Sequence, residues 1–349
     1  MISFLYGCIK PILFLKSAES AHHFTLQTLK KANRLGLLKY ASPASIQDPI
    51  KLMGISLPNR VGLAAGLDKN GDYLSELGQL GFGFIEIGTV TPKPQPGNPI
   101  PRMFRLPKAN AIINRMGFNN QGVDYLVNNV KNSTYAGVLG INIGKNAATS
   151  VEHAVNDYLS ALEVVYAYGD YVTVNISSPN TKNLRDLQSQ VYLMNLLQQL
   201  KQKQIDLARE HGKYTPIAIK IAPDLDDNEV KSIAELLKQN EIDGVIATNT
   251  TIDKELVKAL PDGQEQGGLS GPPVHQKSLR IIQQLRAELG SQFSIIGVGG
   301  IESGKQAVEK IRAGADAVQI YTGLIYKGPS LIHECAATIA FNCVPKKQH

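Results

Sequence analysis

The chain has 349 residues, of which 43% are hydrophobic and 19% are charged, a composition typical of a folded globular protein and not of a disordered one. Its three cysteines are far apart and form no CxxC pair, which argues against a disulfide framework or a zinc ribbon and favours a reducing compartment. The net charge of +6 is concentrated at one end, because residues 1–40 hold six basic side chains and one acidic one. A nucleic-acid-binding protein normally spreads its basic residues over a docking face, so this distribution argues against that class.

The first predicted element is an apolar segment, Ile2–Leu15, which Lys10 and Pro11 interrupt. Neither uninterrupted piece approaches the ~20 residues that a membrane-spanning helix needs. The lysines lie inside and after the apolar run instead of before it, which also argues against a cleaved signal peptide. The segment is therefore predicted to be helical without crossing a membrane.

A second helix is predicted to begin after the N-cap Ser17 and to end near Arg34, just before Gly36. Its apolar and small side chains fall on one side and its basic side chains lie off that side. Such a pair of helices is typical of a segment that lies on an anionic membrane surface. The alternative is a helical pair packed on its own domain with solvated lysines, and these residues alone leave both open. We divide the chain into this N-terminal segment, residues 1–40, and a main domain, residues 41–349.

Downstream of Ile50 one unit repeats, in which a short β-rich apolar run precedes a stretch with helical periodicity. Eight such units predict an α/β fold, a closed (β/α)8 barrel, whereas an open doubly wound sheet would normally have about six strands and a nucleotide fingerprint at its first turn. The predicted strands are Val61–Ala65, Phe84–Val90, Val138–Ile143, Tyr171–Ile176, Ile217–Ile221, Gly244–Thr248, Ser294–Val298 and Ala317–Tyr321. Helices are predicted in stretches such as Val151–Tyr168, Asn228–Gln239, Gly304–Ala313 and Pro329–Phe341.

Two insertions interrupt this repeat, the Pro-rich loop Thr91–Arg115 and the segment Thr251–Pro273. No long low-complexity linker divides the repeating region. The region downstream of Ile50 is therefore predicted to be one domain.

Polar residues follow nearly every predicted strand, at the end where a barrel of this kind carries its active site. A single Asn or Gly at a strand end means little, because turns favour these residues. A converging set of amides, hydroxyls and two lysines predicts a site for a flat, hydrogen-bonding heterocycle with an anionic group. The absence of paired carboxylates and of a strand-end histidine argues against glycosidase and metal-hydrolase chemistry. The set comprises Lys69, Thr89, Asn142, Asn175, Ser178, Asn180, Lys220, Thr248, Asn249, Thr250, Tyr321 and Thr322.

The last two units predict a phosphate site. Ile295–Ala307 reads as strand, glycine turn and helix, and Ile320–Gly328 follows one unit later. Backbone N–H groups at such turns bind phosphate without a cationic side chain. The stretch also contains GxxxxGK, the start of a P-loop, but Gln306 replaces the Ser or Thr that would hold Mg²⁺, so we interpret this match as chance.

These strand-end motifs resemble the dihydroorotate dehydrogenase family, and the match covers essentially the whole chain in order. The N-terminal extension and the serine in NISSPNT resemble the membrane-associated, quinone-dependent class 2 members, whereas class 1 members lack the extension and have a cysteine base. The motifs are AAGLDKNG (Ala64–Gly71), EIGTVTPKPQPGNP (Glu86–Pro99), INRMGFNNQG (Ile113–Gly122), GINIGKN (Gly140–Asn146), NISSPNT (Asn175–Thr181), IKIAPDL (Ile219–Leu225), ATNTT (Ala247–Thr251), GGLSG (Gly267–Gly271), GVGGI (Gly297–Ile301) and QIYTG (Gln319–Gly323).

The resemblance implies a two-step redox cycle in pyrimidine (UMP) biosynthesis. Dihydroorotate gives a hydride to FMN and a proton to a base, which yields orotate, and a ubiquinone-type quinone then reoxidises the flavin. The base is implied to be Ser178, which needs a relay through Thr181 or ordered water, because serine alone is a poor base. The resemblance further implies a peripheral enzyme on the cytoplasmic face of the inner membrane, with FMN and no metal.

The resemblance also assigns residues to the two ligands. Lys69 is implied to pair with the substrate carboxylate, and Lys220 to lie near the flavin edge where a cation favours the reduced anionic form. The implied substrate residues are Lys69, Asn114, Arg115, Met116, Gly117, Phe118, Asn175, Asn180, Asn249 and Thr250. The implied FMN residues are Ala65, Gly66, Leu67, Asp68, Lys69, Thr89, Asn142, Asn175, Lys220 and Thr248, with Gly271, Gly300, Tyr321 and Thr322 at the phosphate.

For the quinone, the resemblance points to His22 on the second helix, Arg105 and Tyr321, with the helical pair as the mouth of an apolar tunnel. The alternative for His22 is an ordinary surface histidine. The neighbouring His23 leaves open which of the two histidines faces the quinone.

Three other functions fit parts of the pattern. A phosphate-binding barrel isomerase would share the phosphate site, but it needs a strand-end Glu, Asp or His as proton shuttle, and none is convincing. A non-catalytic regulatory barrel at a membrane gives no reason for amides at four strand ends. NAD as electron acceptor is disfavoured because the sequence contains no dinucleotide fingerprint.

Overall fold

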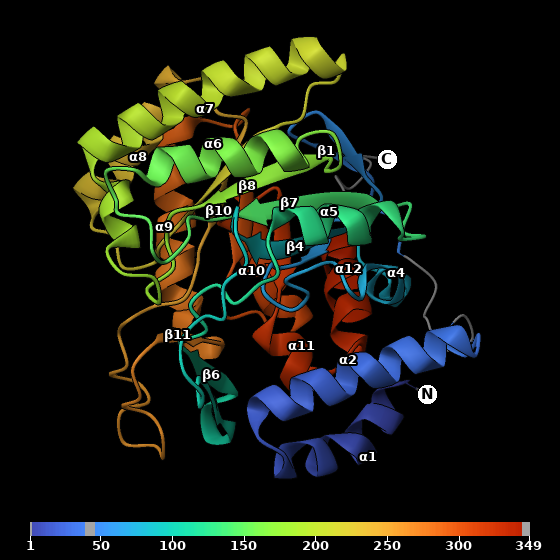
Figure 1. The fold of residues 1–349 in the computed structure, drawn as a ribbon. Coiled ribbons are helices and arrows are strands. Elements are labelled where there is room, and N and C mark those ends of the chain that lie inside the picture. The colour runs from blue at the N-terminus through green and yellow to red at the C-terminus, as the bar shows by residue number, and fades with distance from the viewer. Residues whose placement is uncertain (1, 39–45, 344–349) are drawn as a thin grey trace, which may run out of the picture.

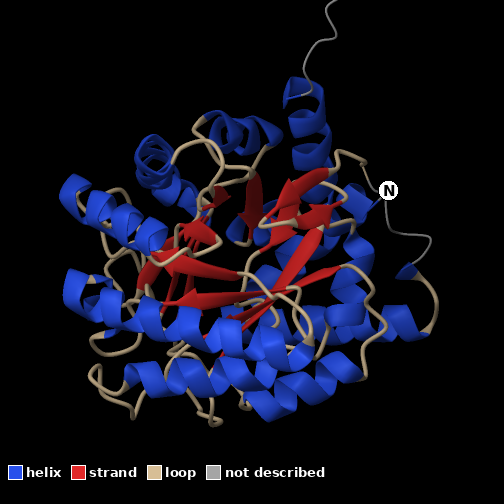
Figure 2. Cartoon of the chain, turned by 90° about the horizontal axis from the view of Figure 1, so that it is seen from above, coloured by secondary structure: helices blue, strands red, loops and turns tan. Residues whose placement is uncertain are grey.

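A closed barrel of eight parallel strands forms the centre of the molecule, and Figure 2 shows these strands enclosed by helices. The computed structural model describes residues 2–38 and 46–343, so the predicted domain boundary at residue 40 lies outside the described residues. All eight predicted strands are confirmed, with ends that differ by at most two residues. They are β3 (Val61–Leu63), β4 (Phe84–Val90), β7 (Val138–Ile143), β8 (Tyr171–Asn175), β9 (Ile217–Ile221), β10 (Gly244–Ala247), β12 (Ser294–Val298) and β13 (Ala317–Ile320).

Helices cover the outside of the barrel, as the alternating pattern predicts. The strands are buried on both faces, which is why they read as nearly continuous apolar runs. Asp226 and Glu229 form a capping box that starts α8. The helices are α4 (Leu74–Leu77), α5 (Val123–Lys131), α6 (Ala154–Val165), α7 (Gln190–His211), α8 (Asp227–Gln239), α9 (His275–Leu289), α10 (Gly304–Arg312), α11 (Thr322–Lys327) and α12 (Ser330–Cys343), with 3-10 turns η1 (Gly78–Leu80), η2 (Pro107–Ala109), η3 (Leu184–Gln188) and η4 (Pro272–Val274).

A hairpin that the sequence analysis did not predict closes the N-terminal end of the barrel. It consists of β1 (Ile50–Leu52) and β2 (Ile55–Leu57), paired antiparallel. Leu52 and Leu57 are buried in a cluster with Phe84 and other inward-facing residues of the barrel. Because this end is filled with apolar side chains, the opposite end is left for ligands.

The first insertion was predicted as a loop and no structure was predicted for the second, but together they form a small antiparallel sheet. β5 (Met103–Leu106) and β6 (Ala111–Asn114) come from the first insertion, and β11 (Gly268–Ser270) comes from the second. Figure 1 shows β6 and β11 side by side, on the side of the barrel where the N-terminal helices lie. This sheet forms a wall over the C-terminal ends of the barrel strands.

The N-terminal segment forms two helices, α1 (Ile2–Leu15) and α2 (Ala18–Arg34), and α1 continues through Pro11. The predicted cap of α2 is confirmed, because Ser17 Oγ accepts a hydrogen bond from the backbone N–H of Ser20 at 3.3 Å. Both helices lie at the lower side of the molecule in Figure 1, where α2 contacts α4 and β5. Within residues 2–38 and 46–343, no helix is long and apolar enough to cross a membrane.

Candidate active site

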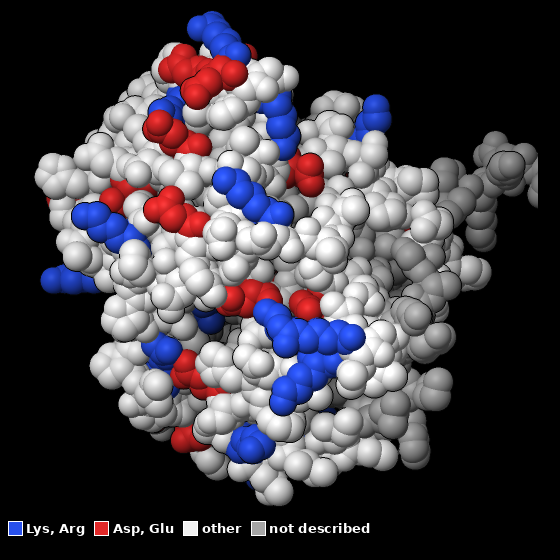
Figure 3. Space-filling model, turned by 45° about the vertical axis from the view of Figure 1, so that its right-hand side comes forward, with Lys and Arg blue, Asp and Glu red and all other residues white. Residues whose placement is uncertain are grey.

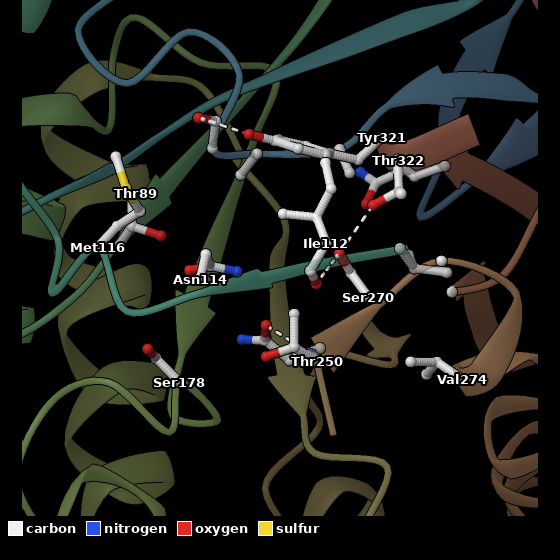
Figure 4. A pocket seen from close by; sticks show the side chains of 18 of the residues that line it. Thr89, Ile112, Asn114, Met116, Ser178, Thr250, Ser270, Val274, Tyr321 and Thr322 are labelled. Atoms are coloured by element: carbon white, nitrogen blue, oxygen red, sulfur yellow. Dashed lines mark hydrogen bonds between the residues drawn. The ribbon is translucent and has the colours of Figure 1, made fainter. Parts of the chain in front are cut away.

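A cavity lies between the C-terminal ends of the barrel strands and the β5–β6–β11 sheet. In Figure 4, Asn114, Ser178 and Thr250 surround one part of it, while Ser270 and Thr322 lie at the other. Most of the predicted site residues line it, although they come from many separate strand ends. Those that do are Ala65, Gly66, Lys69, Thr89, Asn114, Met116, Gly117, Phe118, Asn175, Ser178, Asn180, Lys220, Asn249, Thr250, Gly271, Gly300, Tyr321 and Thr322.

Three residues that the resemblance assigned to the ligands point elsewhere. Leu67 lies in the main hydrophobic core. Asp68 accepts hydrogen bonds from the backbone N–H groups of Asp72 at 2.9 Å and Tyr73 at 2.8 Å, and its burial raises the pKa to about 6. Arg115 forms an ion pair with Glu265 at 2.6 Å beside the second insertion. None of these three residues is part of the cavity lining.

Asn142 and Thr248 lie one layer behind the cavity wall. Asn142 Oδ1 accepts a hydrogen bond from Thr89 Oγ1 at 2.6 Å, and Thr89 does line the cavity. The backbone N–H of Thr248 donates to the carbonyl of Val298 at 2.9 Å, which joins the ends of β10 and β12. Both residues therefore contact residues that line the cavity, Thr89 and Val298, and do not line it themselves.

Two lysines face the cavity, and neither ammonium group has a hydrogen-bond partner within the described chain. Burial lowers the pKa of Lys69 to about 8, and the nearby Glu19 carboxylate opposes this shift. Burial also lowers the pKa of Lys220, against the charge of Glu86. A buried ammonium group that is not hydrogen-bonded to a carboxylate is unfavourable, so the cavity is suited to a ligand that carries negative charge.

The amide side chains around the cavity are hydrogen-bonded to one another. Asn249 Nδ2 donates to Asn175 Oδ1 at 3.2 Å, and Asn175 Nδ2 donates to Thr89 Oγ1 at 3.0 Å. Asn180 Nδ2 donates to Asn114 Oδ1 at 3.1 Å. These bonds fix the side-chain orientations before a ligand binds, which reduces the entropy lost on binding.

The candidate base, Ser178, is 6% exposed and lines this amide-rich part of the cavity. Its Oγ accepts a hydrogen bond from the backbone N–H of Asn180 at 3.3 Å. Two further hydroxyl oxygens, that of Thr181 three residues along the chain and that of Thr250 in the cavity lining, are buried and have no partner among the residues that the structure describes. Buried polar groups are normally paired, so these hydroxyls are available to water or ligand.

The other end of the cavity is shaped by glycines that have no room for a side chain. Gly271 has φ 96° and Gly300 has φ 75°. A Cβ on Gly300 would lie 2.5 Å from the Cβ of His275, and one on Gly271 would lie 2.6 Å from the carbonyl oxygen of Asn110. Glycine at both positions therefore permits a positive φ and the close approach of the neighbouring segments at His275 and Asn110.

Of the predicted quinone residues, Tyr321 lines the cavity, whereas His22 and Arg105 are not part of its lining. Burial, with the positive charge of Lys69, lowers the pKa of His22 to about 3, so this imidazole is neutral near pH 7. Arg105 donates to the carbonyl oxygens of Leu13 at 3.2 Å and Phe14 at 3.3 Å, and therefore holds the C-terminal end of α1.

Comparison with known proteins now identifies the family. A sequence profile described as Dihydroorotate dehydrogenase matches residues 49–341. The chain belongs to the dihydroorotate dehydrogenase family.

Similar members of the dihydroorotate dehydrogenase family cover almost the full chain. A dihydroorotate dehydrogenase (quinone) of Neisseria meningitidis is 58% identical over 336 residues, which is 96% of this chain and 100% of that protein. One of Chromobacterium violaceum is also 58% identical, over 96% of this chain and 98% of that protein. The crystal structure of DHODH in complex with ferulenol from Eimeria tenella has a TM-score of 0.85 at 34% identity, over 95% of this chain and 93% of that chain.

The cofactor of the dihydroorotate dehydrogenase family is FMN, and the residues in this cavity fit it. The glycine-shaped end suits a phosphate, because Gly271, Gly300 and Thr322 line it and backbone N–H groups at glycine turns bind phosphate without a cationic side chain. Buried oxygens without a partner in the described residues, such as Gln319 Oε1, suit a ring with hydrogen-bond donors. Lys220 adds a positive charge at the same strand ends.

Sequence reasoning missed two kinds of residue in this dihydroorotate dehydrogenase. Glu86 and Gln319 lie in the middle of β4 and β13, whereas only polar residues at the C-terminal ends of strands or just past them were considered. A glutamate within an apolar strand of a closed barrel was a usable signal, because it cannot face the apolar helices outside. Glu19 and Arg102 form a 2.7 Å ion pair between α2 and the first insertion, which no local pattern indicates.

Proposed function

We propose that the chain oxidises dihydroorotate to orotate through FMN and passes the electrons to a quinone, in pyrimidine biosynthesis. The observation that carries this proposal is the cavity itself. It combines Lys69 and Lys220, neither of which has an anionic hydrogen-bond partner in the described chain, with orientated amides and a glycine-shaped end. The activity named for relatives that are 58% identical agrees with this chemistry.

We assign the glycine-shaped end to the phosphate of FMN and the strand-end part to its ring. Backbone groups of Gly271, Gly300 and Thr322 would hold the phosphate. The side-chain hydroxyl of Thr322 donates a 2.8 Å hydrogen bond to Ser270 Oγ, which fixes the orientation of the Thr322 side chain. Lys220 and Thr89 would contact the ring. When bound, FMN supplies the acceptor for a hydride and passes on electrons one or two at a time.

The amide-rich part is assigned to the substrate. The Lys69 ammonium would pair with the carboxylate of dihydroorotate, and the amides of Asn114, Asn175 and Asn249 would bond the polar edges of its ring. The substrate loses a hydride from one ring carbon and a proton from its neighbour, and the ring gains a double bond. Ser178 Oγ takes the proton, and the unpaired hydroxyl of Thr181 offers a route for it through a water molecule.

The N-terminal helices are assigned to the quinone side and to peripheral attachment to a membrane. Ile12 and Leu15 of α1 expose apolar side chains, and the last turn of α2 carries Lys31 and Arg34. Figure 3 shows basic side chains gathered over the lower part of the molecule, at the height where Figure 1 places α2. Exposed apolar and basic groups together favour an anionic membrane surface.

Between the two adjacent histidines, the geometry favours His22 for the quinone. His22 is half-buried and close enough to Lys69 for the lysine charge to lower its pKa, whereas His23 is exposed. A neutral imidazole donates through one ring nitrogen and accepts through the other, which suits a quinone oxygen.

Stopped-flow absorbance of the purified holoprotein tests this function. Dihydroorotate is added without oxygen, and a soluble ubiquinone analogue follows. Bleaching of the visible flavin band and then fast recovery is the expected result. Recovery with fumarate or NAD but not with the quinone would contradict the acceptor. A protein that cannot be reconstituted with FMN would contradict the whole proposal.

A further inference from the structure

Glu86 is a carboxylate inside the barrel, below the cavity, and the mechanism above does not use it. It lies in the middle of β4 and is fully buried. Its Oε1 accepts a hydrogen bond from Asn142 Nδ2 at 2.7 Å. Its Oε2 accepts bonds from the side chains of Gln319 at 2.8 Å, Tyr171 at 3.0 Å and Thr173 at 3.1 Å. Because a carboxylate only accepts hydrogen bonds, each of these neighbours must present a donor to it.

The first consequence concerns Asn142. With Nδ2 turned to Glu86, the amide oxygen of Asn142 must face the cavity wall, where it accepts from Thr89 at 2.6 Å and from Asn175 Nδ2 at 3.4 Å. Asn175 then turns its own oxygen towards Asn249 Nδ2, at 3.2 Å. Glu86 therefore sets the orientation of the Asn142 amide, and hydrogen bonds pass this orientation through Asn175 to Asn249, which faces the substrate part of the cavity.

Backbone N–H groups independently fix the orientation of Asn249 and Asn175, the amides at the other end of this hydrogen-bonded series. Asn249 Oδ1 accepts from the backbone N–H of Thr250 at 2.8 Å, and the backbone N–H of Ser177 donates to Asn175 Oδ1 at 3.3 Å. A backbone N–H can only donate. Fixed donors at one end and a fixed acceptor, Glu86, at the other leave the amides between them a single consistent orientation.

The second consequence concerns Gln319 in β13. Its Nε2 is turned to Glu86, so its Oε1 is the atom left for other partners. Gln319 lines the cavity, and Oε1 is buried without a partner in the described residues. A buried carbonyl oxygen in this position is available to a donor from a bound ring.

We propose that Glu86 is a positioning residue, which determines whether the amides of Asn142 and Gln319 turn oxygen or nitrogen towards the ring-binding cavity. The proposal rests on the proposed function, because the rings in question are those of the flavin and the pyrimidine. Glu86 touches neither ring and acts only through the two amides. Its negative charge also opposes the effect of burial on Lys220 and so helps to keep that side chain positively charged.

The variant E86Q tests the proposal, since glutamine has nearly the same shape but presents one donor and one acceptor. If its Nε2 faces Asn142, the N–H groups of the new glutamine amide and of Asn142 Nδ2 would face each other, and the hydrogen bond between the two side chains is lost. If its Nε2 faces Gln319, then Gln319 must turn its nitrogen to the cavity. Either orientation leaves one cavity-wall amide wrongly turned. The exchange variants E86Q/N142D and E86Q/Q319E restore an acceptor opposite the new donor and keep the total charge.

The measurements are the dissociation constants of orotate and of FMN, determined on holoprotein and on reconstituted apoprotein. We expect E86Q to weaken orotate binding roughly tenfold or more, because a buried donor loses its acceptor. At least one exchange variant is expected to recover most of the loss. The control is E76Q, because Glu76 is also buried and bonded to an amide, Asn33 at 3.1 Å, but lies in α4 away from the cavity. It is expected to bind orotate normally.

Several outcomes would overturn the proposal. Orotate and FMN binding within about twofold of normal in E86Q would do so, and so would exchange variants that are weaker than E86Q itself. If E86Q is insoluble, soluble FMN-binding protein from an exchange variant is expected, and insolubility of all three variants contradicts the proposal. Failure of the unsubstituted protein to bind orotate would instead reject the proposed function, and the FMN constants would still test Glu86.

Discussion

The cavity end of the barrel and the N-terminal helix pair are held together in different ways. In the cavity, side chains from separate strands bond one another, as Asn175 does with Thr89 and Asn249. In the helix pair, Ile12 is 62% and Leu15 is 87% exposed, and polar contacts such as those of Arg105 attach α1 to β5. Under the proposed assignment, the residues for substrate oxidation lie in the cavity, whereas those for quinone access, apart from Tyr321, lie at the helix pair. Substitutions in the two regions should then affect different half-reactions.

The largest expected effect is that of S178A. Removal of the proposed base should slow flavin reduction by dihydroorotate about 10³-fold, because no other side chain takes the proton. Reoxidation of chemically reduced protein by a quinone should be unchanged, and FMN should remain bound. Stopped-flow traces of the two half-reactions measure both rates. An equal loss in both would show that the two regions are not separate.

A smaller effect is expected for K69M, which removes the proposed partner of the substrate carboxylate. Orotate binding should weaken about thirtyfold near pH 7, as expected for a lost hydrogen bond between charged groups. In the unsubstituted protein, the pKa of Lys69 near 8 implies that orotate binds more weakly as pH rises through that value, because the ammonium loses its proton. Titration of the flavin spectrum from pH 6 to 9 measures this. Binding that does not change with pH would contradict the role of Lys69.

R105A tests the other region. The variant loses the bonds to the carbonyl groups at the end of α1, so quinone-dependent reoxidation should fall about tenfold. Reduction by dihydroorotate should stay within about twofold of normal. The matched control is R60A, which breaks a 2.7 Å ion pair with Asp48 away from both sites. If R105A slowed flavin reduction as much as reoxidation, the assignment of the two half-reactions to different regions would be contradicted.

The smallest expected effect is on folding stability in L15S. Because Leu15 is almost fully exposed, its replacement should change the free energy of unfolding by less than about 0.5 kcal/mol. Binding to vesicles that contain anionic lipid should nevertheless weaken, because apolar surface for the membrane is lost. Denaturant unfolding and vesicle sedimentation measure the two quantities. Unchanged sedimentation would argue against α1 as a membrane contact.

The barrel could be predicted from the sequence because each strand is buried on both faces and carries its own apolar run. The β5–β6–β11 sheet could not, because its strands have only three or four residues and β6 pairs with a strand from the other insertion. A local pattern contains no information on a partner so distant in the chain. The hairpin of β1 and β2 was missed for its short length as well.

Some residues of the candidate site could be predicted from the sequence, and others could not. Residues such as Lys69 and Asn249 follow strands, where the fold itself brings polar groups together. Leu67 and Arg115 also belong to the family motifs, but their side chains point away from the cavity. A sequence motif does not specify the direction of each side chain. Glu86 lies within a strand, and its role appears only when its four donors are seen together.

The pairing of β6 with β11 has a consequence for how the protein is made. β6 ends at residue 114 and β11 begins at residue 268, so the wall over the cavity joins segments far apart in the order of synthesis. A growing chain cannot complete this wall until about three-quarters of its 349 residues have been translated. The glycine turn at Gly300 and the strand end at Thr322 emerge later still. Thr322 lies just past β13, the strand that closes the barrel against β3, so the proposed flavin site cannot be complete before that strand has been synthesised.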